Sequence, residues 1–319
     1  MAAQETSLQG ESLNELLEQA QDHIAGHRLG DAIDALEKAL AVDFDHPDVA
    51  TVLKYANFWK ERDALVEQIG SDFEKGEYLL SQWSTFRRFV ERVGEAAEPW
   101  MASVRAHVFG LALAKYETLL DDSGGTDAEL LLRIGRCHKA LGHYDTARHY
   151  LEQAGRHRRE DAAILAELAD CYALVNETQR AKAFFREAFF VSPSRIDLDL
   201  LESEMIRRLT AKVREEGYEQ PELAEWLPVY GVVYGVFSVK RELRSIEYGK
   251  LRQSIYALER EVHEHSHGEI DSAKKARLIN RYFWLIDHYV NTGEERNKID
   301  EIRLKIRQLS LKAYEAFTH

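Results

Sequence analysis

The sequence repeats itself with a period of 34 residues in its middle. Seven positions between 131 and 154 carry a large apolar, small or aromatic residue, and the residue 34 positions later is of the same type in each case. The first copy has Leu131, Ile134, Gly135, His138, Ala147, Leu151 and Ala154, and the second has Leu165, Leu168, Ala169, Tyr172, Ala181, Phe185 and Ala188. A period of this length constrains the fold more than composition does, because stacked copies of one unit share one architecture.

The spacing of apolar residues predicts that each copy is helical. Leu130, Ile134, Cys137 and Leu141 are separated by steps of 4, 3 and 4, which places them on one face of a helix. No run of alternating β-branched residues predicts a strand. The five prolines stand where this periodicity breaks, at positions 47, 99, 193, 221 and 228. Because proline inside a helix costs about 3 kcal/mol, we expect helices to end near them. The predicted fold class is all-α.

The repeat resembles the tetratricopeptide repeat. Gly135 and Ala169 stand where a small residue lets the two helices of a unit approach closely, and Pro193 closes the second copy. The resemblance is clearest over residues 127–194 and implies an α-solenoid of antiparallel helix pairs. A third copy is predicted near the N-terminus from Leu16, Ala20, His23, Ala32, Leu36 and Ala39. Three further helical segments are predicted at Val49 to Ile69, Phe73 to Val93 and Trp100 to Leu120.

Four regions are expected along the chain. They are a lead over residues 1–12, an N-terminal repeat with degenerate helical pairs over 13–126, two regular repeats over 127–194, and a divergent helical region over 195–319. The last region has apolar seams at Leu251 to Val262, Leu278 to Tyr289 and Ile299 to Ala313. These helices are expected to cap the open end of the array. The alternative is a dimer formed through them, although each seam is shorter than three heptads.

Charge and hydropathy restrict the class of partner. The 319 residues carry a formal charge of -13, which repels phosphate backbones and anionic lipids. No segment reaches the roughly 20 apolar residues of a membrane helix, and the N-terminus lacks the features of a secretory signal. We therefore expect a cytoplasmic protein without nucleic-acid or membrane partners.

The two cysteines, Cys137 and Cys171, occupy equivalent positions in successive repeats. Equivalent helices in a stacked array pack about 8–10 Å apart, whereas a disulfide needs Cα atoms within about 7 Å. We expect both thiols to be free and buried. No phosphate loop, dinucleotide fingerprint or nucleophile motif is present, so the sequence predicts no enzyme and no cofactor.

Histidines provide the weak indication of a metal site. His263, His265 and His267 alternate in a short segment before Gly268 and could bind zinc or nickel. A solvated helix end is the simpler interpretation, because no cysteine or second ligand cluster lies nearby. A ligand- or metal-responsive regulator working through this segment is kept as an alternative function.

The resemblance also implies a function. In tetratricopeptide repeats the first helix of each unit lines a concave groove that holds a peptide or a helix of a partner. By position, this points to a set of charged first-helix residues: Arg133, Arg136, Lys139, Glu167 and Asp170. A carboxylate clamp is not supported, because Leu17 and Gln21 stand where it would begin. The predicted function is a protein-binding scaffold or adaptor, and an oligomeric component of a larger assembly is the alternative.

A second candidate surface is an aromatic stripe in the C-terminal region. Trp226, Tyr230, Tyr234 and Phe237 are spaced by 4, 4 and 3, with Gly231 between them. Contact between C-terminal helices accounts for this spacing most simply. An exposed partner site is the alternative, because aromatic residues concentrate at interaction surfaces.

Overall fold

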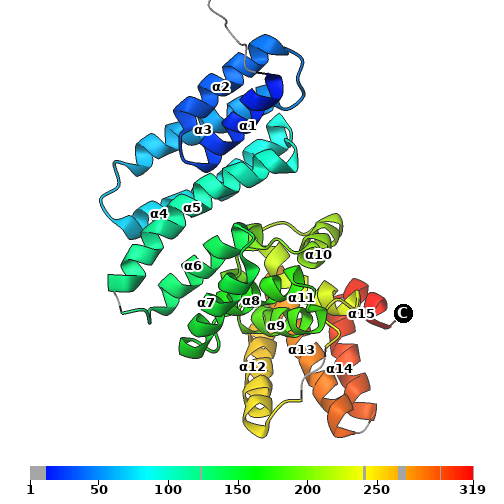
Figure 1. Ribbon diagram of the computed structural model, residues 1–319. Helices are drawn as coiled ribbons and strands as arrows, with labels where there is room; N and C mark the ends of the chain where they lie inside the picture. The colour runs from blue at the N-terminus through cyan, green and yellow to red at the C-terminus, as the bar shows by residue number, and fades with distance from the viewer. Residues whose placement is uncertain (1–11, 123, 240–241, 265–270, 295, 319) are drawn as a thin grey trace, which may run out of the picture. The chain divides into compact units, whose positions relative to one another are not determined.

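The computed structural model describes residues 12–122, 124–239, 242–264, 271–294 and 296–318. In these ranges the regular structure consists of α-helices and two short 3-10 helices, with no strand, as Figure 1 shows. The predicted all-α class is confirmed, and the helices form the consecutive hairpins of a helical-repeat solenoid. Contacts divide the chain into two compact units, residues 1–147 and 148–319, and the division falls inside one helix.

The first unit is built from long helices joined in consecutive pairs. They are α1 (Leu13–Ala25), α2 (Leu29–Val42), α3 (Val49–Val66), α4 (Asp72–Val93), α5 (Glu98–Asp122), α6 (Ala128–Ala140) and the start of α7 (Tyr144–His157). Helix α1 packs on α2, α4 on α5, and α5 also contacts α1 and α6. The helices expected after the first repeat are therefore present, with ends shifted by a few residues.

The second unit continues with two more repeat helices and then departs from the pattern. Its elements are the end of α7, α8 (Ala162–Leu174), α9 (Thr178–Val191), η1 (Pro193–Arg195), η2 (Leu198–Leu200), α10 (Glu204–Glu215), α11 (Glu222–Val233), α12 (Ser245–Glu264), α13 (Ser272–Thr292), α14 (Arg296–Leu309) and α15 (Leu311–Thr318). Helix α13 lies between α11, α12 and α14 and contacts each of them.

Three helix-to-helix turns share one geometry and identify three copies of the repeat. In each turn one residue is left-handed, with φ of 62° at His27, 81° at Gly142 and 64° at Asn176. The amide that follows bonds back five residues, for example from His143 to the carbonyl of His138 at 2.9 Å. This is the C-terminal motif that satisfies the last carbonyls of a helix. The helix pair in which the sequence predicts an N-terminal copy therefore has the same turn as the two central pairs.

The repeat positions form buried cores, as predicted. Leu16, Ala20, Ala32, Leu36 and Ala39 are buried in the first copy, and the equivalent residues from Leu131 to Ala154 are buried in the second. In the third copy Ala169 and Ala181 are fully buried on α8 and α9, which pack closely. Small residues at these positions allow the close approach of the paired helices.

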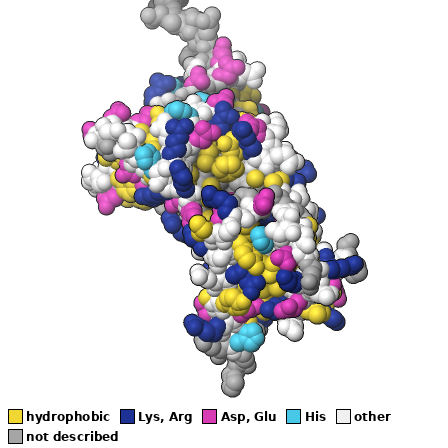
Figure 2. Space-filling view, turned by 90° about the horizontal axis from the view of Figure 1, so that it is seen from below, with side chains coloured by type: hydrophobic (Ala, Val, Ile, Leu, Met, Phe, Trp, Pro, Cys, Tyr) yellow, Lys and Arg dark blue, Asp and Glu magenta, His cyan; other side chains and the backbone are white. Residues whose placement is uncertain are grey.

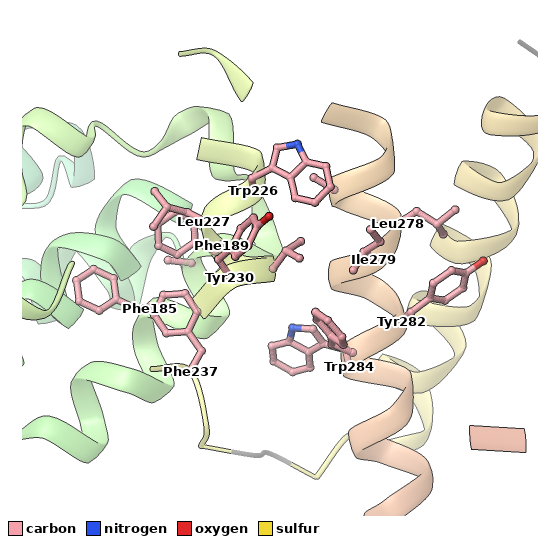
Figure 3. Packing of buried hydrophobic residues seen from close by; sticks show 14 of the residues in the cluster. Phe185, Phe189, Trp226, Leu227, Tyr230, Phe237, Leu278, Ile279, Tyr282 and Trp284 are labelled. Carbon is pink, nitrogen blue, oxygen red and sulfur yellow. The ribbon is translucent and has the colours of Figure 1, made fainter. Parts of the chain in front are cut away.

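Aromatic residues dominate the core of the second unit. Phe189 of α9 stacks on Phe237 with ring centroids 5.7 Å apart, and Phe190 contacts Trp284 of α13 at 4.5 Å. Figure 3 shows Phe189 of α9 beside Phe237, and Trp284 on α13. Burying each ring stabilises the fold by about 1.5–3 kcal/mol. The C-terminal helices therefore pack directly against the repeat helices and share one core with them.

Two expectations about helix ends were wrong. Pro228 lies inside α11, where it is buried, and does not end that helix. Burial of its ring among apolar neighbours offsets the one helical hydrogen bond that proline cannot donate. The seam from Ile299 to Ala313 is two helices, because Ser310 caps α15 by accepting the Ala313 amide at 3.2 Å.

Within the described ranges, no helix is both long enough and apolar enough to cross a lipid bilayer.

Candidate interaction surfaces

Arg133 on α6 is held by two carboxylates of the first unit. Its Nε and Nη2 atoms donate to Glu77 of α4 at 2.6 and 2.9 Å, and Nη1 lies 2.8 Å from Glu129. The hydroxyl of Tyr116 on α5 donates to the same Glu77 at 2.6 Å. Glu129 lies four residues before Arg133 on the same helix, whereas the stronger bidentate partner, Glu77, comes from another helix.

Burial and pairing act against each other at this site. Burial acts to raise the pKa of Glu77, but the hydrogen bonds from Arg133 and Tyr116 outweigh it and hold the pKa below its ordinary value. Burial likewise acts to lower the pKa of Arg133, and its bonds to Glu77 raise it overall. Both groups are therefore ionised at neutral pH and stabilise each other across α4 and α6.

The other predicted groove residues are buried. Arg136 and Lys139 on α6 have exposed fractions of 8% and 1%, and Glu167 and Asp170 on α8 are equally inaccessible. A partner that bound these side chains would first have to displace their present surroundings. Their role in binding stays a prediction.

Asp170 holds the backbone of a neighbouring segment. Its carboxylate oxygens accept the amides of Glu202 and Ser203 at 2.8 and 2.9 Å, at the start of α10. A first-helix carboxylate thus binds two successive main-chain N–H groups of an extended stretch. The segment that follows α9 also contacts α8 through η1.

The aromatic stripe belongs mainly to the core. Trp226, Tyr230 and Phe237 are buried (Figure 3). Trp226 donates its indole N–H to Ser272 at 2.9 Å and stacks on Tyr218. Tyr234 is the exposed member, and its hydroxyl donates to Glu216 at 2.7 Å. The structure therefore favours the core interpretation for three of the four residues.

The histidine segment is described only in part. His263 is exposed at the end of α12, and its Nδ1 atom lies 2.6 Å from the carbonyl of Glu259. His265 and His267 lie outside the described residues. Among the residues that the structure places, no three histidine, cysteine or acidic side chains form a metal-ligand cluster.

A histidine pair that the sequence did not indicate joins three helices of the first unit. His27, in the α1–α2 turn, contacts His107 of α5 at 3.3 Å between Nδ1 atoms. The opposite nitrogen of His107 lies 3.2 Å from Asp63 of α3. The sequence gave no signal for this contact, because His107 is 80 residues from His27 and 44 residues from Asp63.

Both cysteines are free and buried, as expected.

Charged side chains of both signs are interspersed with small hydrophobic areas on the face shown in Figure 2. In the second unit, a hollow of about 550 Å³ is lined by Tyr218, Trp226, Asp271, Ser272 and Lys275, among others. In this hollow the Ser272 hydroxyl accepts the Trp226 N–H, so these two side chains serve to hold α11 and α13 together.

These features define a helical-repeat protein, a class whose members are typically not enzymes. Comparison with protein families agrees: residues 128–154 match the family model of the tetratricopeptide repeat. That match spans α6 and most of α7 and includes the small and large positions from Leu131 to Ala154. Neither the search of curated proteins nor that of solved structures gave a match.

Proposed function

We propose that this chain is a scaffold that binds a protein partner, through a peptide or helix laid against the first helices of its repeats. The observation that carries the proposal is the repeated helix pair with its left-handed turn, together with the tetratricopeptide match over 128–154. Repeats of this kind present extended surfaces instead of enclosed catalytic sites. A cytoplasmic location is part of the proposal, supported by two free cysteines.

Asp170 supports the chemistry of the proposed contact. Its carboxylate already accepts two backbone amides from one extended segment. A partner segment held by first-helix side chains would use the same bonds, which contribute about 1.5–3 kcal/mol each when the acceptor is charged and desolvated. Glu167 could accept backbone amides in the same way, whereas Arg133, Arg136 and Lys139 would donate to carbonyl or carboxylate oxygens of the partner.

The test uses the full-length chain as bait in cells that express it. A recovered protein is purified and titrated into the chain by calorimetry, with amide hydrogen exchange measured at saturation. We expect saturable binding to a protein and slower exchange around residues 133–139 and 167–170. Protection confined to other regions would contradict the first-helix site, and failure to recover any protein partner would contradict the scaffold.

Self-association through the C-terminal helices is a second candidate. Ile246 and Tyr256 on α12 and Leu304 on α14 are exposed apolar side chains in that region. Light scattering decides between the two functions, because a monomer has a mass of 36.7 kDa. A stable dimer that Ile246→Asp converts to monomer would support the second candidate.

A further inference from the structure

The loop between α2 and α3 presents a phenylalanine to solvent. Phe44 is 81% exposed, and Val42, at the end of α2, is 61% exposed. Among the large hydrophobic residues that the structure describes, Phe44 has the highest exposed fraction. Exposure of an aromatic ring is unfavourable by about 1.5–3 kcal/mol relative to full burial. The ring therefore has that much to gain from a partner that covers it.

Hydrogen bonds hold this loop, residues 43–48, in one conformation. The Asp45 amide donates to the side chain of Asp43 at 3.2 Å, and the Asp48 amide donates to the ring of His46 at 3.3 Å. The Asp48 carboxylate in turn accepts the Ala97 amide at 3.4 Å, which ties the loop to the connection before α5. A ring on a braced loop loses little conformational freedom when it binds, so binding costs less.

The loop that carries the ring and the helix before it are acidic. Residues 31–48 contain six carboxylates and one lysine, which gives this segment a charge of about -5 when His46 is neutral. The carboxylates are Asp31, Asp34, Glu37, Asp43, Asp45 and Asp48. The first three are on the exposed side of α2.

We propose that Phe44 is an anchor by which the chain docks onto a protein carrying an apolar pocket edged by lysine or arginine. The inference rests on the proposed scaffold function and adds a second contact, away from the first helices. A protruding ring requires a concave receptor, and the three carboxylates of its own loop, Asp43, Asp45 and Asp48, favour a basic rim. The same carboxylates repel nucleic acid and anionic lipid, so the receptor is a protein.

Two substitutions separate the ring from the charges. Phe44→Ala removes an exposed side chain, so the melting temperature stays that of the wild type while affinity for the receptor falls at least tenfold. Asp45→Asn leaves the ring in place and slows association, with a weaker dependence on salt. Leu65→Ala is the control, because Leu65 is 48% exposed in the same unit but lies at the other end of α3.

The experiment places the photoreactive residue p-benzoylphenylalanine at position 44, or at 65 as the control, in the chain. Cells that express it are irradiated and the cross-linked peptides are sequenced by mass spectrometry. We expect position 44 to capture one protein at a peptide that combines apolar and basic residues. That protein, once purified, is used for the affinity measurements on Phe44→Ala and Asp45→Asn.

The outcomes separate this inference from the scaffold function. Capture from position 65 or by the bait experiment, but not from position 44, overturns the Phe44 anchor and leaves the scaffold. Cross-links to another copy of this chain, to nucleic acid or to lipid also overturn it, as does unchanged affinity in Phe44→Ala. If neither position nor the bait recovers a protein, the scaffold function fails as well.

Discussion

The Nδ1 atoms of His27 and His107 lie 3.3 Å apart, although 80 residues separate them in the sequence. Only one hydrogen atom fits between two such nitrogens, so one ring donates and the other accepts. The far nitrogen of His107 lies 3.2 Å from the carboxylate of Asp63. The turn between α1 and α2 is thereby tied to α5 and α3.

This pair predicts that the first unit loses stability in mild acid. Burial lowers the pKa of His27, and the neighbouring His107 lowers it further, against an opposing effect of Asp63. Below pH 6.5 the unfolded chain binds a proton at this ring and the folded chain does not, until the pH reaches the lower folded pKa. The contribution of His27 to the free energy of unfolding should therefore be complete above pH 6.5 and should decrease as the pH falls below that value.

Urea unfolding between pH 5 and 8 measures this effect. His27→Asn is the test variant, because asparagine adopts the left-handed turn conformation without strain and does not titrate. We expect the stability of the variant to decrease less steeply with falling pH than that of the wild type. Part of the decrease should remain, because burial and His143 also lower the pKa of His138. Equal slopes in the two proteins would show that His27 is not the titrating group.

Glu77 should matter more to stability than Glu129, although both contact Arg133. Glu77→Ala removes the bidentate acceptor of a largely buried guanidinium and the acceptor of the Tyr116 hydroxyl. We expect a loss of about 1–3 kcal/mol, the cost of leaving buried donors unpaired. Glu129→Ala breaks an ordinary pair four residues apart on α6 and should cost under about 1 kcal/mol. Chemical denaturation of both variants measures the difference.

The same contact changes how partner binding at α6 can be tested. Arg133→Glu would bring two carboxylates together at Glu77 and destabilise α4 against α6. A loss of binding in that variant would report unfolding as well as recognition. Hydrogen exchange on the wild-type chain avoids this ambiguity.

Cys137 and Cys171 should be slow to react in the native chain. Both are free and buried, and burial raises the pKa of the Cys137 thiol, which disfavours the reactive thiolate. An aromatic disulfide reagent should find two thiols in the denatured chain without reductant. In the folded chain the reaction should proceed at the rate of opening. Fast modification of either thiol at pH 7 would contradict the packed repeat core.

The repeat could be predicted from the sequence because it consists of local patterns. Helix periodicity and the 34-residue offset fixed the turns and the buried positions from Leu131 to Ala188, since each depends on residues close in sequence. The surroundings of the charged first-helix residues were harder to predict. Arg133 looks available from its own helix, and only the fold shows that Glu77, 56 residues earlier, binds it.

Contacts between distant segments were the main information missing from the sequence. The His27–His107 pair and the exposure of Phe44 both depend on where other helices place their side chains. Proline misled for a related reason: Pro228 is a helix breaker by local rules, and tertiary burial overrides that rule in α11.

Two glycines in the second unit should respond to alanine in opposite ways. At Gly231 in α11 a Cβ atom would overlap the ring of Phe237, which itself packs on Phe189 and Phe185. Because this ring cluster is buried, it cannot move aside freely, and we expect Gly231→Ala to cost about 1–3 kcal/mol. At Gly249 in α12 no atom lies near the added methyl group. There Gly249→Ala should stabilise the chain by about 0.5–1 kcal/mol, because alanine loses less backbone freedom in a helix. Thermal unfolding of the two variants beside the wild type gives both signs in one experiment. If Gly231→Ala melts at or above the wild-type temperature, the close packing of Phe237 against α11 is incorrect.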